Sequence, residues 1–202
     1  MAVIILDMGG VLMRHNMPLC LQCMENIIGK QNMEKVLGLS NNGEGIENSL
    51  MEQYEVGQIS TNDFIEQILG MAQSDKTRKD VIDAWNAMHD HIPPYRIDIL
   101  HEWNRKGHHL FMLSNNNELH WEHIKVNYAL HDVFEDAFAS HLLHVSKPNP
   151  TIYQIVDQRI RALYPNEVPF IFVDDIAINR EVGESFGWKT YADIETLQQE
   201  LS

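Results

Sequence analysis

Four short apolar runs, separated by long stretches of helical character, constrain the fold of this chain more than any other feature. The runs are Val3–Leu6, Leu110–Leu113, Ala137–Ala139 and Phe170–Val173. Each is too short for a helix and lacks the polar–apolar alternation of a half-exposed strand, so each predicts a buried strand. Because these strands alternate with helices, the sequence predicts βαβ units and a parallel sheet, which is an α/β fold.

The segment from about residue 15 to 93 has no comparable apolar run and shows helix-like periods broken by Gly, Asn and Ser. The helices predicted in and just after this segment are Pro18–Ile28, Ile46–Val56, Thr61–Met71, Lys76–His89 and Tyr95–Arg105. Ser60 or Thr61 would be the N-cap of the third, since a hydroxyl oxygen accepts from the free amides of a first turn. We therefore expect residues 15–93 to form an all-helical insert in an α/β core of residues 1–14 and 94–202.

The acidic balance of the composition narrows the classes of partner. The chain has 29 Asp and Glu against 15 Lys and Arg, and its formal net charge of −14 repels nucleic-acid backbones and anionic lipid surfaces. An anionic substrate would need a local cation. The run Val3–Leu6 stops at Asp7, far short of a spanning helix or a secretory signal. We expect a cytoplasmic protein that binds neither membrane nor nucleic acid, and the sequence predicts no oligomeric state.

Reactive polar side chains follow three of the predicted strands at the point where each strand ends. Asp7 follows the first run, Ser114 follows the second, and the pair Asp174-Asp175 follows the last. Ligands bind in the crevice outside the carboxyl ends of a parallel sheet. Residues far apart in the sequence are therefore expected to converge on one site.

Four motifs stand in order along the chain. They are Leu6-Asp7-Met8-Gly9-Gly10-Val11-Leu12, Leu113-Ser114-Asn115, Ser146-Lys147-Pro148-Asn149-Pro150, and Phe172-Val173-Asp174-Asp175 followed by Asn179 and Gly187-Trp188. Each alone also fits a turn, an N-cap or a solvated lysine. Together, and with a helical insert after the first, they resemble the motifs of the haloacid dehalogenase-like hydrolase superfamily over nearly the whole chain. The resemblance implies a Rossmann-like core with a parallel sheet and makes the insert a small all-helical cap domain.

The resemblance implies a phosphatase in which Asp7 attacks phosphorus to give an aspartyl phosphate. A carboxylate is a poor nucleophile in water and attacks when it is desolvated and aligned. Because an anion then approaches an anion, a divalent cation held by Asp7, Asp174, Asp175 and the Gly9 carbonyl would remove the repulsion and polarise the phosphoryl oxygens. Carboxylates and carbonyls are the hard ligands that Mg²⁺ prefers, so Mg²⁺ is the expected cofactor.

The other residues that the resemblance places in the site bind the phosphoryl group. Lys147 would pair with Asp7 and the phosphoryl group as a point cation. Ser114 and Asn115 would hydrogen-bond phosphoryl oxygens, and Gly10 permits the tight turn that lets the backbone approach them. Catalytic roles are thus expected for Asp7, Ser114 and Lys147, acting on a small phosphorylated metabolite such as a sugar phosphate.

One position departs from the pattern of the family. Its phosphatases usually carry a second Asp two positions after the nucleophile, as the acid that protonates the leaving oxygen, and this chain has Gly9 there. General acid–base groups contribute about 10²- to 10⁴-fold, so we expect a slow phosphatase unless another residue substitutes. His15, the nearest imidazole in the sequence, is one candidate for that role, and a plain loop histidine is the alternative interpretation.

Two other functions stay open on the sequence. A metal-free carbon–halogen hydrolase of the same family would explain Gly9, although the paired acids Asp174 and Asp175 are a liability at a site that binds a carboxylate substrate. A catalytically silent phosphate-binding module on the same fold would also lack an acid at position 9.

The two cysteines and eleven histidines invite redox or zinc interpretations that their spacing does not favour. Cys20 and Cys23 have neither the preceding strand of a redox motif nor two further zinc ligands at matching spacing, so they are expected to share one face of a helix. The pairs His120/His123 and His141/His144 lack the i, i+4 spacing of a zinc-binding HExxH helix. We interpret these histidines as surface and core residues.

Overall fold

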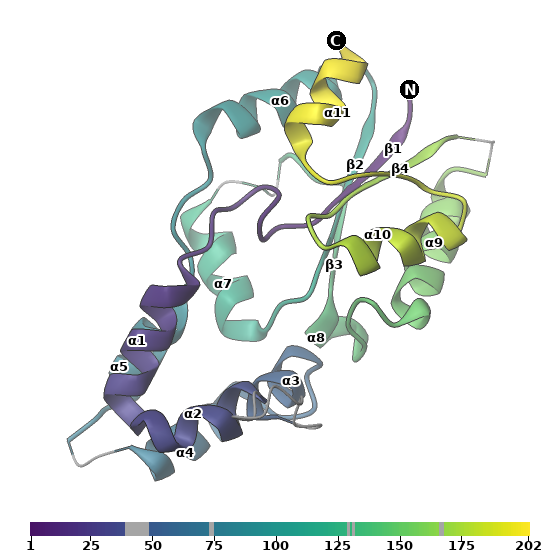
Figure 1. The fold of residues 1–202 in the computed structure, drawn as a ribbon. Helices are drawn as coiled ribbons and strands as arrows, with labels where there is room; N and C mark the ends of the chain where they lie inside the picture. The colour runs from purple at the N-terminus through teal and green to yellow at the C-terminus, as the bar shows by residue number, and fades with distance from the viewer. Residues whose placement is uncertain (39–48, 73–74, 129, 131, 166–167) are drawn as a thin grey trace.

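A parallel sheet forms the centre of the computed structural model, which describes residues 1–38, 49–72, 75–128, 130, 132–165 and 168–202. Within these residues, five strands pair in the order β3-β2-β1-β4-β5, all parallel (Figure 1). The strands are β1 (Val3–Leu6), β2 (His109–Ser114), β3 (Asp136–Ala139), β4 (Phe170–Val173) and β5 (Lys189–Tyr191). The predicted α/β fold with a parallel, Rossmann-like sheet is confirmed.

Helices cover both faces of the sheet, because successive strand residues point to opposite faces. On one face, Ile4 and Leu6 join a buried apolar cluster with residues of α6, α7 and α11. On the other face, Val3 and Ile5 join a cluster with residues of α9. The helices from residue 94 onward are α6 (Pro94–Arg105), α7 (Glu118–Asn127), α8 (Ser140–Leu143), α9 (Pro150–Leu163), α10 (Ala177–Ser185) and α11 (Ile194–Leu201).

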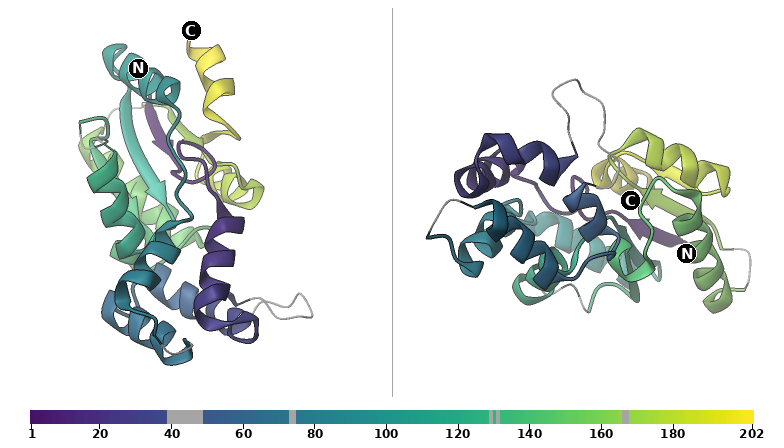
Figure 2. Two further views of the ribbon diagram at one scale, coloured as in Figure 1. Left: turned by 90° about the vertical axis from the view of Figure 1, so that its left-hand side faces the viewer. Right: turned by 90° about the horizontal axis from the view of Figure 1, so that it is seen from below.

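Within the described residues, five helices lie between β1 and α6. They are α1 (Met17–Ile28), α2 (Lys30–Leu37), α3 (Leu50–Glu55), α4 (Thr61–Met71) and α5 (Arg78–Asn86), and we call them the helical insert. The insert has an apolar cluster of its own, which includes Met24, Phe64 and Trp85. It lies beyond the end of the sheet at which the strands finish (Figure 2). The domain boundaries 1–14 with 94–202 and 15–93 stay a prediction.

Capping residues determine where two helices of the insert begin. The Ser60 side chain accepts from the Asp63 amide, and the Asp63 carboxylate accepts from the Ser60 amide, so Ser60, one of the two predicted candidates, is the N-cap of α4. The same reciprocal pair between Thr77 and Asp80 begins α5 at Arg78. The predicted helix over Lys76–His89 was therefore too long at both ends. The first residues of the predicted helix Ile46–Val56 lie outside the described residues.

The strand β5 and the helix α2 are among the elements that the sequence did not predict. The strand β5 is an edge strand whose three residues are exposed or half-buried, so it leaves no apolar run. The helix α2 is short, and only Val36 is fully buried in it, with Met33 and Leu37 packed beside it at helical spacing. No helix within the described residues is both long and apolar enough to cross a membrane.

The chain enters and leaves the insert through two segments that pair as a short antiparallel ribbon. The Arg14 amide donates to the His91 carbonyl at 3.0 Å, and the Asp90 amide donates to the Arg14 carbonyl at 3.1 Å. The Asn16 amide donates to the Met88 carbonyl at 2.7 Å. We call residues 14–16 and 88–91 the linker ribbon. It connects the carboxyl end of the sheet to the insert.

Candidate active site

Asp7 and Asp174 lie side by side because they follow neighbouring strands that pair in register. Leu6, the last residue of β1, pairs with Val173, the last residue of β4. The Asp7 amide continues the ladder by donating to the Val173 carbonyl at 2.9 Å, and the Asp174 amide donates to the Tyr191 carbonyl at 3.1 Å. Both side chains are buried. The structure thus brings together two residues that are far apart in the sequence.

Asp175 completes a group of three carboxylates. One oxygen each from Asp7, Asp174 and Asp175 lies within 4.8 Å of the other two, and Asp175 is the exposed member. Hard carboxylate oxygens at this spacing fit a divalent cation of the Mg²⁺ type. Such a cation also explains why three like charges are crowded together. The expected contribution of the Gly9 carbonyl stays a prediction.

Lys147 supplies a buried positive charge beside Asp7 and Asp174. Its ammonium nitrogen lies 2.6 Å from Oδ2 of Asp174 and 3.1 Å from Oδ1 of Asp7, and it donates to the Leu113 carbonyl at 3.0 Å. Burial acts to lower the pKa of Lys147, but the two carboxylates outweigh it and hold that pKa above its ordinary value. Lys147 is therefore a charged ammonium in the folded protein.

The pKa of Asp7 is raised, whereas a simple ion pair with a lysine would lower the pKa of a carboxyl group. Burial raises the pKa of Asp7 to about 6; Lys147 opposes this shift, and the charge of Asp174 adds to it. A desolvated carboxylate beside a cation is the condition under which Asp becomes a useful nucleophile.

Asn115 and Ser114 occupy the end of β2 beside Lys147. The Asn115 side chain donates to the Lys147 carbonyl at 2.9 Å and accepts from the Lys147 amide at 2.8 Å. Its amide group therefore positions the lysine, and its contact with substrate stays a prediction. Ser114 is 3% exposed and lines the same cavity as Asp7 and Lys147.

Two residues of the first turns of α10 hold Asp174 in place, and no role was predicted for either from the sequence. Asn179 donates through Nδ2 to both carboxylate oxygens of Asp174, at 3.0 and 3.1 Å. Arg180 donates to the Asp174 carbonyl at 2.7 Å. Asn179 was visible in the fourth motif, but its spacing from Asp174 becomes a contact only because α10 begins directly after the acids. The carboxylate is thus oriented before any ligand binds.

Gly9 and Gly10 are both close to other side chains. Gly10 has φ +73°, and a Cβ there would lie 2.3 Å from Oδ2 of Asp175, so position 10 requires glycine. A Cβ at Gly9 would lie 2.1 Å from Cε1 and 2.7 Å from Nε2 of His15. The His15 imidazole therefore occupies the space into which a side chain at position 9 would project. Burial lowers the pKa of His15, while the charge of Asp175 opposes that shift.

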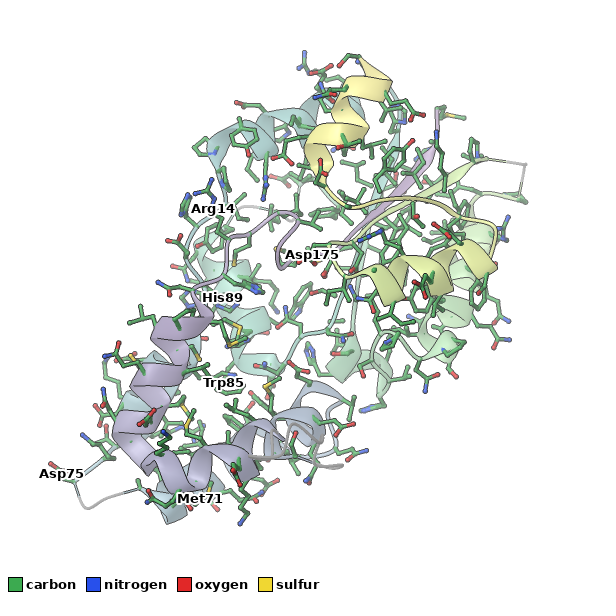
Figure 3. The ribbon with its side chains drawn as sticks, viewed as in Figure 1. Arg14, Met71, Asp75, Trp85, His89 and Asp175 are labelled. Atoms are coloured by element: carbon green, nitrogen blue, oxygen red, sulfur yellow. The ribbon has the colours of Figure 1, made fainter. Side chains whose placement is uncertain are left out.

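A cavity of about 640 Å³ connects these groups with the helical insert. Its core side includes the carboxylates and Lys147, and the linker ribbon contributes Arg14, His15 and His89. The insert contributes Met17, Met51 and Glu55. Figure 3 labels Asp175 at the strand ends, with Arg14 and His89 on the side of the linker ribbon. The cavity has the size of a site for a small molecule.

Cys20 and Cys23 lie on the same helix, as predicted, and the paired histidines include both buried and exposed residues. Cys20 and Cys23 are free thiols on α1, and burial raises the pKa of Cys20 to about 11, which favours its protonated thiol form. His120 is buried, whereas His144 is exposed. Among the described residues, the group with the spacing of a metal site is the carboxylate group and contains no histidine.

Comparison with known proteins places these observations in a family. Residues 1–187 match the family model for haloacid dehalogenase-like hydrolases. A HAD family enzyme from Bacteroides thetaiotaomicron, solved in complex with magnesium and inorganic phosphate, is 28% identical, with a TM-score of 0.80 over 95% of this chain and 93% of that one.

Two more distant structures share the fold. A predicted HAD-like family hydrolase from Porphyromonas gingivalis is 22% identical, with a TM-score of 0.80 over 100% of this chain and 98% of that one. The L-2-haloacid dehalogenase from Xanthobacter autotrophicus is 17% identical, with a TM-score of 0.56 over 94% and 76%. At these identities the likeness concerns the fold alone.

Proposed function

This chain belongs to the haloacid dehalogenase-like hydrolases, and we propose that it is a magnesium-dependent hydrolase of small phosphomonoesters that acts through an aspartyl phosphate on Asp7. The observation that carries the proposal is the charge of the site. Asp7, Asp174 and Asp175 lie within 4.8 Å of one another, and Lys147 is the ammonium that pairs with two of them. Three carboxylates and one ammonium leave two negative charges, which a divalent cation would neutralise.

Each residue of the site would have its own role in the two steps of the reaction. The carboxylate oxygen of Asp7 attacks phosphorus, and the bond between phosphorus and the leaving oxygen breaks. Lys147 neutralises negative charge beside the nucleophile, and the Ser114 hydroxyl donates to a phosphoryl oxygen. Water then attacks the aspartyl phosphate and releases inorganic phosphate and the Asp7 carboxylate. Mg²⁺ bound by Asp7, Asp174 and Asp175 would supply Lewis-acid polarisation of the phosphoryl oxygens.

The helical insert would act as the cap that closes over the leaving group. Met17, Met51 and Glu55 line the cavity from the insert side. Closing such a site excludes water from the phosphoryl group and strengthens the electrostatic interactions inside it. The cavity of about 640 Å³ suits a small phosphorylated metabolite.

Release of phosphate from para-nitrophenyl phosphate and from a panel of sugar phosphates tests the proposal. The wild-type protein should release phosphate in MgCl₂ and lose this activity in EDTA. Asp7→Asn should abolish turnover, whereas the exposed His101→Ala on α6 serves as a matched control and should not. Phosphate release that persists in EDTA or in Asp7→Asn would contradict the proposal.

The alternatives from the same fold have their own readouts. Chloride release from 2-chloropropionate in EDTA would favour the metal-free dehalogenase, which the glycine at position 9 allows but the crowding of Asp7, Asp174 and Asp175 disfavours. Binding of magnesium and phosphate, detected by calorimetry without turnover over hours, would favour a silent binding module.

A further inference from the structure

The position two residues after Asp7 lacks a side chain, and another side chain of this chain fills the space. A Cβ built on Gly9 would lie 2.1 Å from Cε1, 2.7 Å from Nε2 and 3.1 Å from Nδ1 of His15. All three distances are shorter than ordinary van der Waals contact, so the ring occupies the space where a side chain at position 9 would begin. His15 also lines the cavity that contains Asp7, Asp175 and Ser114.

Backbone hydrogen bonds of the residues before and after His15 hold it in this place. Its neighbours Arg14 and Asn16 form three hydrogen bonds with residues 88–91 in the linker ribbon, and His15 itself forms an antiparallel bridge with His89. The His89 ring lies edge-on to the His15 ring, with 6.2 Å between the centroids. The imidazole therefore belongs to a paired segment that joins the core to the insert, and it is not a side chain of a free loop.

Two other titratable side chains of the cavity, His120 and Glu55, are less well placed for chemistry at position 9. Both ring nitrogens of His120 are engaged, with Nε2 3.0 Å from the Trp85 carbonyl oxygen and Nδ1 3.1 Å from Nδ2 of Asn117. Glu55 belongs to α3 of the helical insert, whereas Gly9 follows β1 of the core. His15 is the cavity histidine whose ring contacts Gly9.

Building on the phosphatase function proposed above, we propose that His15 is the catalytic acid and base that substitutes for the absent carboxylate at position 9. In the first step, Asp7 forms its bond to phosphorus, the bond to the leaving oxygen breaks, and a ring N–H of His15 gives its proton to that oxygen. In the second step, the neutral ring accepts a proton from the attacking water as its oxygen bonds to phosphorus. The bond between phosphorus and Asp7 then breaks, which regenerates the carboxylate and the protonated ring.

The dependence of rate on the leaving group tests this role. An acid is needed most for a strongly basic alkoxide and least for the weakly basic nitrophenolate. His15→Ala and His15→Asn should therefore lower single-turnover cleavage of an alkyl phosphate such as glycerol phosphate by about 10²- to 10⁴-fold. Nitrophenolate should still appear from para-nitrophenyl phosphate in a burst of about one equivalent, because attack by Asp7 remains but release of phosphate from Asp7 slows.

Controls separate this role from folding and from the proposed function. His91→Ala removes an exposed imidazole of the same ribbon and should leave both reactions unchanged. The Tm of the His15 variants, and its increase with MgCl₂, should match those of the wild type. An equal loss on both substrates, no loss on either, or the same leaving-group dependence in Glu55→Gln instead would overturn the role of His15. A wild-type protein that cleaves neither substrate would instead overturn the phosphatase function itself.

Discussion

The ammonium nitrogen of Lys147 lies 2.6 Å from Oδ2 of Asp174, and neither side chain is more than 1% exposed. The same nitrogen lies 3.1 Å from Oδ1 of Asp7. One buried cation thus serves two carboxylates. A buried ion pair adds little net stability, but removal of one partner leaves the other charge buried and uncompensated. Lys147 should therefore be needed for folding as well as for catalysis.

Lys147→Met is expected to lower the free energy of unfolding by about 3–5 kcal/mol, because it leaves the Asp174 carboxylate without its cation. For a chain of this length the Tm should fall by roughly 6–20 °C. Lys189→Met is the matched control, since its ion pair with Glu200 is exposed on both sides, and it should leave the Tm nearly unchanged. Thermal unfolding followed by circular dichroism measures both. Similar shifts in the two variants would contradict the prediction.

The contact between His15 and Gly9 predicts a non-additive pair of substitutions. In the wild-type background, Gly9→Asp should bring no gain in kcat, because its Cβ would lie 2.1 Å from the His15 ring. In the His15→Ala background the space is free, and Gly9→Asp should recover most of the activity that His15→Ala loses, about 10²- to 10⁴-fold. Values of kcat for the four proteins of this double-mutant cycle check the prediction. Additive effects would show that the two positions do not share one space.

The strand-end residues could be predicted from the sequence because hydropathy alone defines the strands. The runs Val3–Leu6 and Phe170–Val173 coincide with β1 and β4, and their register places Asp7 beside Asp174. The edge strand β5 leaves no such signal, since its side chains are not buried.

The contacts made by side chains of turns and ribbons could not be predicted in the same way. The ring of His15 reaches Gly9 only because residues 14–16 pair with residues 88–91, and no local pattern encodes that pairing. The side-chain amide of Asn115 bonds the backbone of Lys147, which lies far along the sequence, and the sequence did not predict this contact. Such long-range polar contacts depend on the packed fold.

Asp175 offers a test of the metal site that does not depend on turnover. In EDTA, Asp175→Asn should be at least as stable as the wild type, because it removes a like charge near Asp7 and Asp174. In millimolar MgCl₂ its Tm should rise less than that of the wild type, since ligand binding stabilises by RT ln(1 + [L]/Kd) and the affinity is lower. Glu181→Gln, an exposed change on α10, should behave as the wild type. Equal increases in Tm for all three proteins would contradict a magnesium site here.

His120 links the core to the insert in a way that requires a neutral ring. The Trp85 carbonyl can only accept, so Nε2 of His120 donates to it at 3.0 Å, and Nδ1 accepts from Nδ2 of Asn117 at 3.1 Å. Protonation would place a second N–H against the Asn117 amide donor. Burial lowers the pKa of His120 to about 3, and His89 adds to the shift. Burial likewise lowers the pKa of His89 to about 4.

The free energy of unfolding should therefore fall as the pH is lowered, because the folded protein holds these two histidines neutral. Below the ordinary histidine pKa of about 6.5 the unfolded chain binds protons that the folded chain does not, so the contribution of His120 is complete above that pH and is lost toward about pH 3. His120→Gln should lower the slope of unfolding free energy against pH, between about pH 6 and 4, by up to about 1.4 kcal/mol per pH unit. Urea titrations at several pH values measure the slope, and the exposed His101→Gln is the matched control. Part of the slope that remains in His120→Gln is due to His89. A slope equal to that of the wild type would mean that His120 is not held neutral by this contact between core and insert.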